Sequence, residues 1–87
     1  MFIILAYDVR VSRINKVRKV VKQYLSPVQK SVFEGFLSEG KLKKLKDELL
    51  ACVDTDEDSI RIYTFPGFQG ASVLEVGKTS GQDRNIL

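Results

Sequence analysis

Asp8 is the residue of this chain with the clearest capacity for chemistry. It follows the apolar run Phe2–Ala6 and shares the alternation of Ile4, a position where a carboxylate is costly to bury without a partner. Carboxylate oxygens bind hard cations such as Mg²⁺ or Mn²⁺, which polarise a phosphoryl group and activate water in phosphodiester cleavage. Two structural interpretations compete with this one: Asp8 caps the following helix, or it pairs with Arg10 or Arg13.

A single aspartate supplies too few ligands for metal-dependent cleavage. A twofold homodimer changes that count, because an isologous interface can bring both copies of Asp8 to one axis, where they would share a Mg²⁺ or Mn²⁺ ion. Catalysis by Asp8 is therefore expected only from a dimer.

The composition excludes most other catalytic chemistries. The chain has no histidine, which removes the commonest general base, the usual zinc ligand and histidine-activated nucleophiles. The single cysteine, Cys52, has no lysine or arginine within five residues to lower its pKa, so we interpret it as a core residue. The acidic run Asp54–Asp58 lacks the spacing of a calcium loop and is interpreted as a solvated turn. No glycine pair has the spacing of a phosphate-binding loop.

Lysine and arginine are concentrated in the first half of the chain. The net charge is only +3, but eleven of the fourteen basic residues lie between residues 10 and 46, against two acidic residues. Such a surface binds phosphodiester backbones by releasing counterions, without reading base sequence. The alternative is that these side chains only solvate helix faces. The residues that we predict to contact nucleic acid are Arg13, Lys16, Arg18, Lys19, Lys22, Lys41 and Lys44.

Three further residues are candidate substrate contacts. Tyr7 points to the opposite side of its strand from Asp8, so core packing is the simpler interpretation. Ser31 and Phe33 share one face of a strand-like segment. There the Ser31 hydroxyl could meet a phosphate, and the Phe33 ring could stack on a base or pack in the core, of which packing is the stronger interpretation.

The periodicity of apolar residues predicts the elements that position these side chains. Residues 2–9 are apolar on both faces, which is typical of a strand covered on both sides. The other predicted elements are a helix opened by Ser12 and ended by Pro27, a strand region over 28–37 with a bend or bulge at Gly35, a helix opened at Ser38, and strands over 59–65 and 73–76.

This order predicts a single α+β domain whose helices pack on one face of a mostly antiparallel sheet. If residues 28–37 form two short pairing strands, the arrangement becomes the ferredoxin-like βαββαβ sandwich. No apolar run is long enough to span a bilayer, and the run Phe2–Ala6 lacks the basic segment that precedes a signal peptide core. Together with the unpaired cysteine, these features favour a soluble cytoplasmic protein.

Three segments, in this order, resemble the Cas2 family of CRISPR adaptation proteins. They are Tyr-Asp-Val at 7–9, Gln-Lys-Ser-Val-Phe-Glu-Gly at 29–35 and Asp-Ser-Ile-Arg-Ile-Tyr at 58–63. The resemblance implies a ferredoxin-like domain over residues 1–87, with two helices on one face of an antiparallel sheet and an extra C-terminal strand. It also implies a homodimer in which residues 72–87, the C-terminal strand and tail, pair with the partner subunit.

The same resemblance implies a function in spacer acquisition together with the CRISPR integrase subunit. Members of the family are metal-dependent endonucleases on RNA or double-stranded DNA, and the position that matches their metal ligand at the dimer axis is Asp8. The alternative function is that of a non-catalytic scaffold that bridges the integrase subunits and the spacer DNA. A third possible function is that of a small basic interaction module whose acidic connector binds another protein. The chain departs from the family pattern at Pro27, where a basic residue is frequent, and at Lys30, where an aromatic residue is common, so RNA and DNA both remain open as substrates.

Overall fold

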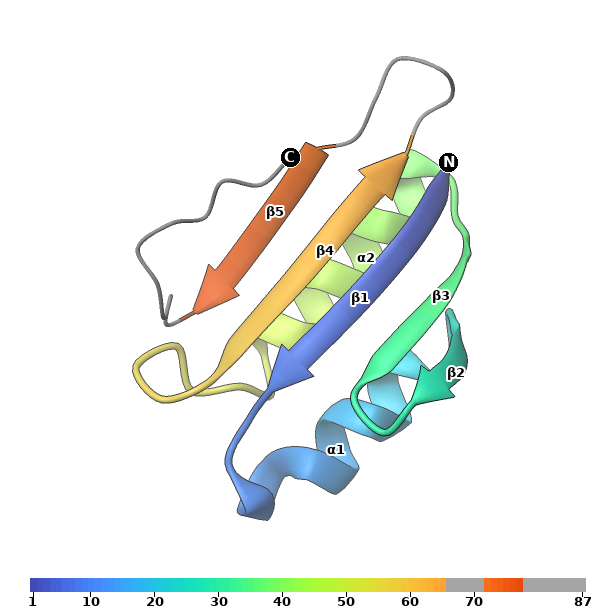
Figure 1. Cartoon of the computed structure of the whole chain (residues 1–87). Helices are drawn as coiled ribbons and strands as arrows, with labels where there is room; N and C mark the ends of the chain where they lie inside the picture. Colours follow the sequence, from blue (N-terminus) through green and yellow to red (C-terminus); the bar gives the residue numbers. More distant parts are fainter. Residues whose placement is uncertain (66–71, 78–87) are drawn as a thin grey trace.

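In the described part of the chain, five strands form one antiparallel sheet, and two helices pack on one side of it (Figure 1). The computed structural model describes residues 1–65 and 72–77. Its elements are β1 (Phe2–Asp8), α1 (Val11–Val21), β2 (Ser26–Gln29), β3 (Val32–Phe36), α2 (Glu39–Leu50), β4 (Ser59–Phe65) and β5 (Ser72–Gly77). The sheet order is β2-β3-β1-β4-β5. The first four strands therefore have the predicted ferredoxin-like arrangement, and the predicted extra C-terminal strand lies at the edge of the sheet beside β4 of its own chain.

The segment 28–37 divides into a hairpin, which is the condition on which the βαββαβ prediction depended. Its first strand begins at Ser26 and includes Pro27, which an edge strand tolerates because one side of it needs no partner. The register shifts between Pro27 and Gln29, so the irregularity predicted at Gly35 lies in β2 instead. At Gly35 the space for a side chain is restricted, because a Cβ there would lie 3.1 Å from Cδ2 of Leu25.

The two helices begin in different ways. Ser38 caps α2 as predicted, since its hydroxyl accepts a hydrogen bond from the backbone N–H of Lys41 at 3.2 Å. The prediction of Ser12 as the cap of α1 is wrong, because the helix begins at Val11 and its N-cap residue is Arg10, which has no side-chain cap. A different group binds the backbone at Arg10, as described below for the site.

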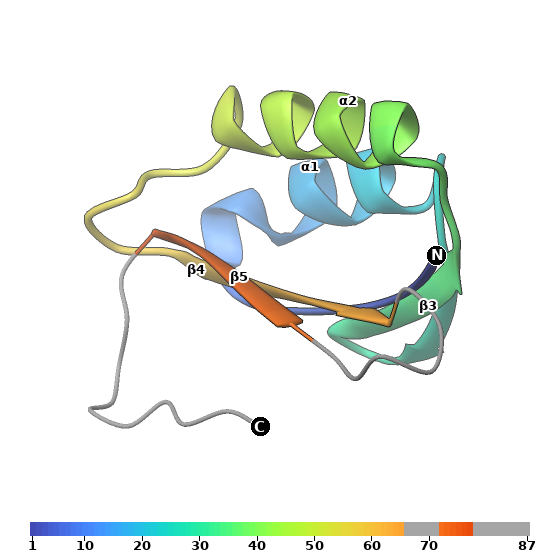
Figure 2. The same cartoon turned by 90° about the horizontal axis from the view of Figure 1, so that it is seen from above.

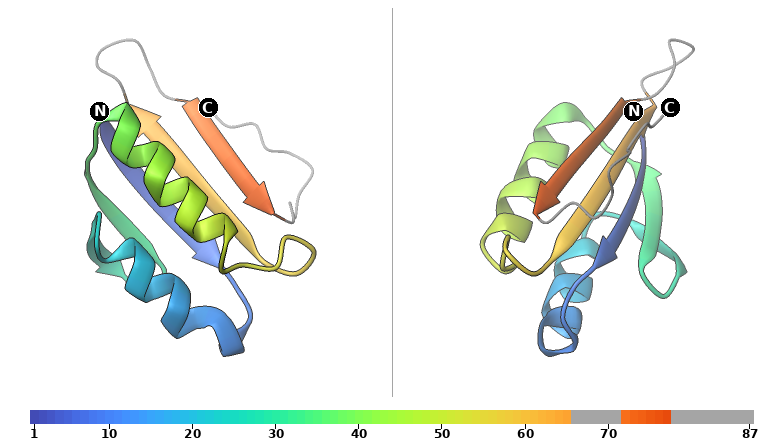
Figure 3. Two further views of the ribbon diagram at one scale, coloured as in Figure 1. Left: turned by 180° about the vertical axis from the view of Figure 1, so that it is seen from behind. Right: turned by 60° about the vertical axis from the view of Figure 1, so that its left-hand side comes forward.

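Both helices cover the same face of the sheet, and the core lies between these two layers (Figures 2 and 3). The buried side chains of β1 are Ile3, Leu5 and Tyr7. Each helix contributes a stripe of buried side chains, which includes Val17 on α1 and Leu45 on α2. The other face, which we call the helix-free face, carries the alternate residues of β1. These are half-buried, apart from Asp8, which is exposed. The prediction that both faces of β1 are covered is therefore wrong for the single chain.

Aromatic rings gather on the helix-free face. The Phe2 ring centroid lies 5.0 Å from that of Phe36 and 6.1 Å from that of Phe65. Phe36 is 77% exposed, which is unusual for a phenylalanine in a small domain and marks this face as a candidate interface.

The final strand pairs with its own chain in this structure. Its register with β4 runs from Ser59 opposite Gly77 to Thr64 opposite Ser72. Gly77 has φ of 94°, and a Cβ there would lie 2.2 Å from the carbonyl oxygen of Asp58, so only glycine fits. Residues 72–77 thus add to their own sheet, whereas the resemblance implied pairing with a partner subunit. Pairing of the tail stays a prediction, because residues 78–87 lie outside the described residues.

Neither α1 nor α2 is long and apolar enough to cross a membrane, and these are the helices of the described part of the chain.

Candidate functional site

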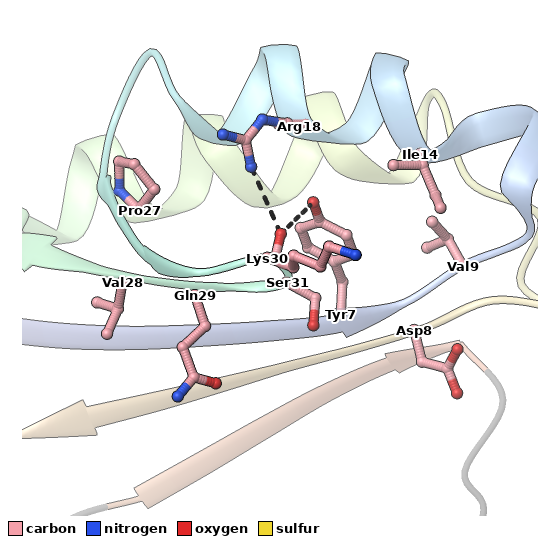
Figure 4. A pocket seen from close by; sticks show the side chains of 10 residues that line it. All are labelled: Tyr7, Asp8, Val9, Ile14, Arg18, Pro27, Val28, Gln29, Lys30 and Ser31. Atoms are coloured by element: carbon pink, nitrogen blue, oxygen red, sulfur yellow. Dashed lines mark hydrogen bonds between the residues drawn. The ribbon is translucent and has the colours of Figure 1, made fainter.

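Asp8 ends β1 on the helix-free face, opposite Ser59 of β4. Its carboxylate is exposed and points to the other side of the strand from Tyr7 (Figure 4). Neither competing interpretation of Asp8 holds, because Asp58 and not Asp8 binds the backbone at the start of α1, and Arg10 and Arg13 pair with Glu57 and Asp58. Among residues 1–65 and 72–77 no hydrogen bond or ion pair engages this carboxylate, which leaves its oxygens available for a ligand.

The acid that holds the start of α1 is Asp58, which the sequence analysis missed. Its side chain is fully buried. One carboxylate oxygen accepts from the backbone N–H of Arg10 at 2.9 Å and from Nη2 of Arg13 at 3.1 Å. The other accepts from Nε of Arg13 at 2.5 Å and from the backbone N–H of Asp54 at 2.9 Å. The Arg13 guanidinium, aided by the two backbone N–H groups, lowers the pKa of Asp58 to about 2.

The interpretation of Asp54–Asp58 as a solvated turn is therefore wrong for Asp58. A signal was present in the sequence, since Asp58 shares the alternation of Ile60 and Ile62, which face the core. Because Arg10 lies two residues after Asp8, Asp58 fixes the backbone immediately beyond the candidate site.

The predicted nucleic-acid contacts separate into paired and free cations. Asp58 and Glu57 bind Arg13 and raise its pKa, so this residue is a structural partner rather than a free surface charge. Arg18 donates to the carbonyl of Lys30 at 3.4 Å, and its guanidinium carbon lies 5.5 Å from the centroid of the Phe33 ring. Within the described part of the chain no acid pairs with the remaining predicted cations, Lys16, Lys19, Lys22, Lys41 and Lys44.

These free lysines lie on the helices, and the helices cover the face opposite Asp8 (Figure 2). In a single chain the free lysines and the Asp8 carboxylate therefore lie on opposite faces of the sheet. Arg18, Lys19 and Lys22 are nevertheless clustered, since they line a hollow of about 250 Å³ with Asn15.

Tyr7 and Phe33 pack in the core, as their simpler interpretations predicted. Phe33 is fully buried and Tyr7 is 7% exposed, and their rings stack with centroids 6.0 Å apart. Phe33 is therefore not available to stack on a base. The Tyr7 hydroxyl donates to the carbonyl of Lys30 at 3.2 Å, and its backbone N–H donates to the carbonyl of Ser31 at 3.1 Å. Tyr7 thus attaches the tip of the β2–β3 hairpin to the end of β1.

A groove of about 750 Å³ lies between α1, the end of β1 and this hairpin (Figure 4). Its lining residues are Tyr7, Asp8, Val9, Ile14, Arg18, Pro27, Val28, Gln29, Lys30 and Ser31. The groove brings together Asp8 and three of the other candidates, Tyr7, Arg18 and Ser31.

The described residues of one chain do not offer a complete metal site. Among the described residues no group of three or more histidine, cysteine, aspartate or glutamate side chains could hold a metal ion together. Asp8 supplies one carboxylate, whereas Mg²⁺ is held by one or two carboxylates plus water or phosphate oxygens in an octahedron. A hard cation fits only if a second copy or the nucleic acid supplies further oxygens.

The comparisons with known proteins agree on one family. Residues 1–70 match the family model of the CRISPR associated protein Cas2. A Thermotoga maritima protein named CRISPR-associated endoribonuclease Cas2 is 40% identical over 87 residues, which cover all of both chains. A protein of the same name from Methanocaldococcus jannaschii is 46% identical over 66 residues, or 76% of this chain and 58% of that protein. The crystal structure of Streptococcus pyogenes Cas2 matches with a TM-score of 0.69 and 31% identity, covering 75% of this chain and 86% of that one. By sequence and by fold, the chain belongs to the Cas2 family of CRISPR-associated proteins.

Proposed function

We propose that this protein acts in CRISPR adaptation as a homodimer that binds nucleic acid and cleaves phosphodiesters with a divalent metal ion held by two copies of Asp8. The observation that carries the proposal is the position of Asp8, which is exposed, without a partner among the described residues, and on the same sheet face as an aromatic cluster that includes the exposed Phe36. The relatives named endoribonucleases support the nuclease activity.

The dimer would form through the helix-free face. The rings of Phe2, Phe36 and Phe65 cluster there, and both helices of the described residues, α1 and α2, lie on the other side of the sheet (Figure 2). A second copy packed on this face would bury these rings. If the twofold axis passes near the end of β1, the Asp8 carboxylates of the two copies would lie opposite each other. Bound between them, Mg²⁺ or Mn²⁺ would polarise the phosphodiester and lower the pKa of a bound water.

Nucleic acid would be held by the cations that have no acidic partner in the described part of the chain. Lys19 and Lys22 with Arg18 form one group on α1, and Lys41 and Lys44 form another on α2. The contribution of such residues is independent of base sequence and falls steeply with salt concentration.

The test compares Asp8→Asn with Asp56→Asn, an exposed aspartate in the connector before β4. Purified variants are incubated with single-stranded RNA and duplex DNA, with Mg²⁺, with Mn²⁺ and with EDTA. We expect Asp8→Asn to lose cleavage by a hundredfold or more while its affinity in EDTA changes less than twofold, and Asp56→Asn to behave as the wild type. Cleavage that persists in Asp8→Asn shows that the chemistry is elsewhere.

A specific observation favours a second candidate, the non-catalytic scaffold. The basic helices and Asp8 lie on opposite faces of one chain, so a duplex lying along the helices would not meet the carboxylate of the same chain. As a scaffold, the dimer would bridge the CRISPR integrase subunits and the spacer DNA, and Asp8→Asn would still support spacer acquisition in cells that supply the integrase. Loss of acquisition in this variant, with the dimer intact, excludes the pure scaffold.

A further inference from the structure

Ser59 lies directly opposite Asp8 in the antiparallel pairing of β1 with β4. Its neighbours in the sequence, Asp58 and Ile60, are both buried against the helices, so the Ser59 side chain projects from the helix-free face. Residues opposite each other in such a pair share one face, and their Cβ atoms lie about 4.5–5.5 Å apart. The Ser59 hydroxyl and the Asp8 carboxylate are therefore neighbours on that face.

The Ser59 hydroxyl is free to bind a ligand. The residue is half-buried, and among residues 1–65 and 72–77 its hydroxyl has no hydrogen-bond partner. The residue opposite it on β5 is Gly77, which its φ of 94° requires to be glycine. No side chain of β5 at this position therefore covers the hydroxyl, and the end of the sheet presents a carboxylate and a hydroxyl side by side.

The surrounding structure holds Asp8 and Ser59 in a fixed relation. On one side of the pair, the strands continue with Tyr7 opposite Ile60. On the other side, the backbone N–H of Arg10 donates to the buried carboxylate of Asp58 at 2.9 Å. Because β1 and β4 are joined on both sides of the pair, a ligand that needs both oxygens does not bear the cost of bringing the strands together.

A hydroxyl beside a carboxylate suits a hard divalent cation. Mg²⁺ prefers oxygen ligands and is bound by one or two carboxylates while it keeps several waters. Serine and threonine hydroxyls also hold Mg²⁺ in proteins that transfer phosphoryl groups. The pair thus offers two kinds of oxygen donor that the same ion accepts.

We propose that the Ser59 hydroxyl is a further ligand of the divalent cation at Asp8. This inference rests on the proposed function, because it adds a residue to the metal site that was assigned there to Asp8 alone. In the proposed dimer, each copy would contribute a carboxylate and a hydroxyl, and oxygens of water and phosphate would complete the octahedron. The added hydroxyl lessens the shortage of ligands that a single aspartate leaves.

The experiment measures binding of Mn²⁺ in the absence of nucleic acid, so that it does not depend on cleavage. The full chain is freed of metal, and the electron paramagnetic resonance signal of free Mn²⁺ is followed as protein is added. We expect Ser59→Ala to weaken Mn²⁺ binding about tenfold, the lower end of the loss seen when groups that support a metal site are removed. Ser26→Ala is the matched control, because Ser26 of β2 also lies opposite a carboxylate, that of Glu34, and it should leave the affinity unchanged.

The variant Ser59→Cys separates metal ligation from an effect on structure. A thiolate favours soft cations over hard ones, so we expect this variant to bind Mn²⁺ more weakly than the wild type and Cd²⁺ more tightly. The native Cys52 is present in both proteins and does not account for a difference between them. Ser59→Thr keeps a hydroxyl and suits a strand, so it should retain the Mn²⁺ affinity. Thermal unfolding followed by circular dichroism verifies that each variant is folded.

Mn²⁺ affinity that is lost in Asp8→Asn but unchanged in Ser59→Ala overturns the inference and leaves the proposed metal site at Asp8 intact. Affinity that is unchanged in both variants overturns the metal site of the proposed function as well. If Ser59→Ala keeps its Mn²⁺ affinity but binds the RNA or DNA substrate more weakly in EDTA, the hydroxyl contacts a phosphate rather than the cation, and the inference is equally overturned.

Discussion

Replacing Asp58 by asparagine tests whether the hydrogen bonds of its carboxylate fix the backbone between the end of β1 and the start of α1. Each carboxylate oxygen accepts two hydrogen bonds, one of them from a backbone N–H group, and the side chain is fully buried. Asparagine keeps one oxygen and puts an NH₂ group in place of the other. Whichever way the amide is oriented, two of the four donors then face a donor.

The expected loss of stability follows from this count. Removing one partner of a buried ion pair costs about 3–5 kcal/mol, but the Arg13 side chain is 24% exposed and keeps Glu57 as a partner. We therefore expect Asp58→Asn to lower the free energy of unfolding by about 3 kcal/mol at pH 7, which corresponds to a Tm lower by about 12–24 °C for a chain of this size. Glu57→Gln is the control, and it removes only a partly exposed partner of Arg13, worth about 0–1 kcal/mol.

The pH dependence gives an independent measure of the same interaction. The pKa of Asp58 is lowered to about 2 in the folded protein, against about 3.9 in an unfolded chain. Its contribution is fully present above pH 5 and is lost as the pH falls through 4 towards 2, which amounts to roughly 2 kcal/mol. Urea unfolding at fixed protein concentration should show the gap between wild type and Asp58→Asn narrowing by that amount between pH 5 and pH 2. A constant gap would refute the assignment of the depressed pKa to this network.

Three further predictions concern other parts of the molecule. Phe36→Asn should weaken self-association at least tenfold in sedimentation velocity, because it removes an exposed ring from the proposed interface; an unchanged dimer would place the interface elsewhere. Lys22→Gln should reduce the slope of log affinity against log salt by about one, whereas Arg13→Gln should leave the slope nearly unchanged and lower the Tm, since Asp58 already neutralises Arg13; equal slopes for both variants would contradict this division. Gly77→Ala should destabilise the protein by about 1–3 kcal/mol, because its positive φ and the carbonyl of Asp58 leave no room for a Cβ; an unchanged Tm would contradict the described end of β5.

The sequence predicted the fold well because its elements carry strong local patterns. The alternation in residues 59–65 and the cap at Ser38 each specified an element without tertiary information. The prediction for the second face of β1 was wrong for the single chain. Apolar residues on both faces of a strand indicate that both faces are buried, but they do not indicate whether the covering layer belongs to the same chain or to a second copy.

The candidate site was only partly predictable. The alternation of residues along β1 predicted that Asp8 and Tyr7 point to opposite faces and that Tyr7 packs in the core. The excess of lysine over acidic residues in the first half of the chain indicated the lysines as candidate nucleic-acid contacts. The pairing of Arg13 with Asp58 did not, because it joins residues 45 positions apart, and a charge count along the chain treats them as separate blocks. The groove was equally inaccessible to sequence reasoning, since its walls come from three elements that only the tertiary fold brings together.

The Asp58 network has a consequence for the order in which the chain folds. The bond from Arg10 to Asp58 spans 48 residues, whereas the β2–β3 hairpin joins neighbouring segments. Long-range closure is the slow part of folding, because the entropy of the intervening chain is lost before the contact forms. The hairpin side of the groove can thus form early, while the backbone beyond Asp8 is fixed only when β4 docks. A chain interrupted before Asp58 would retain Asp8 but not the contact that fixes the backbone beyond it.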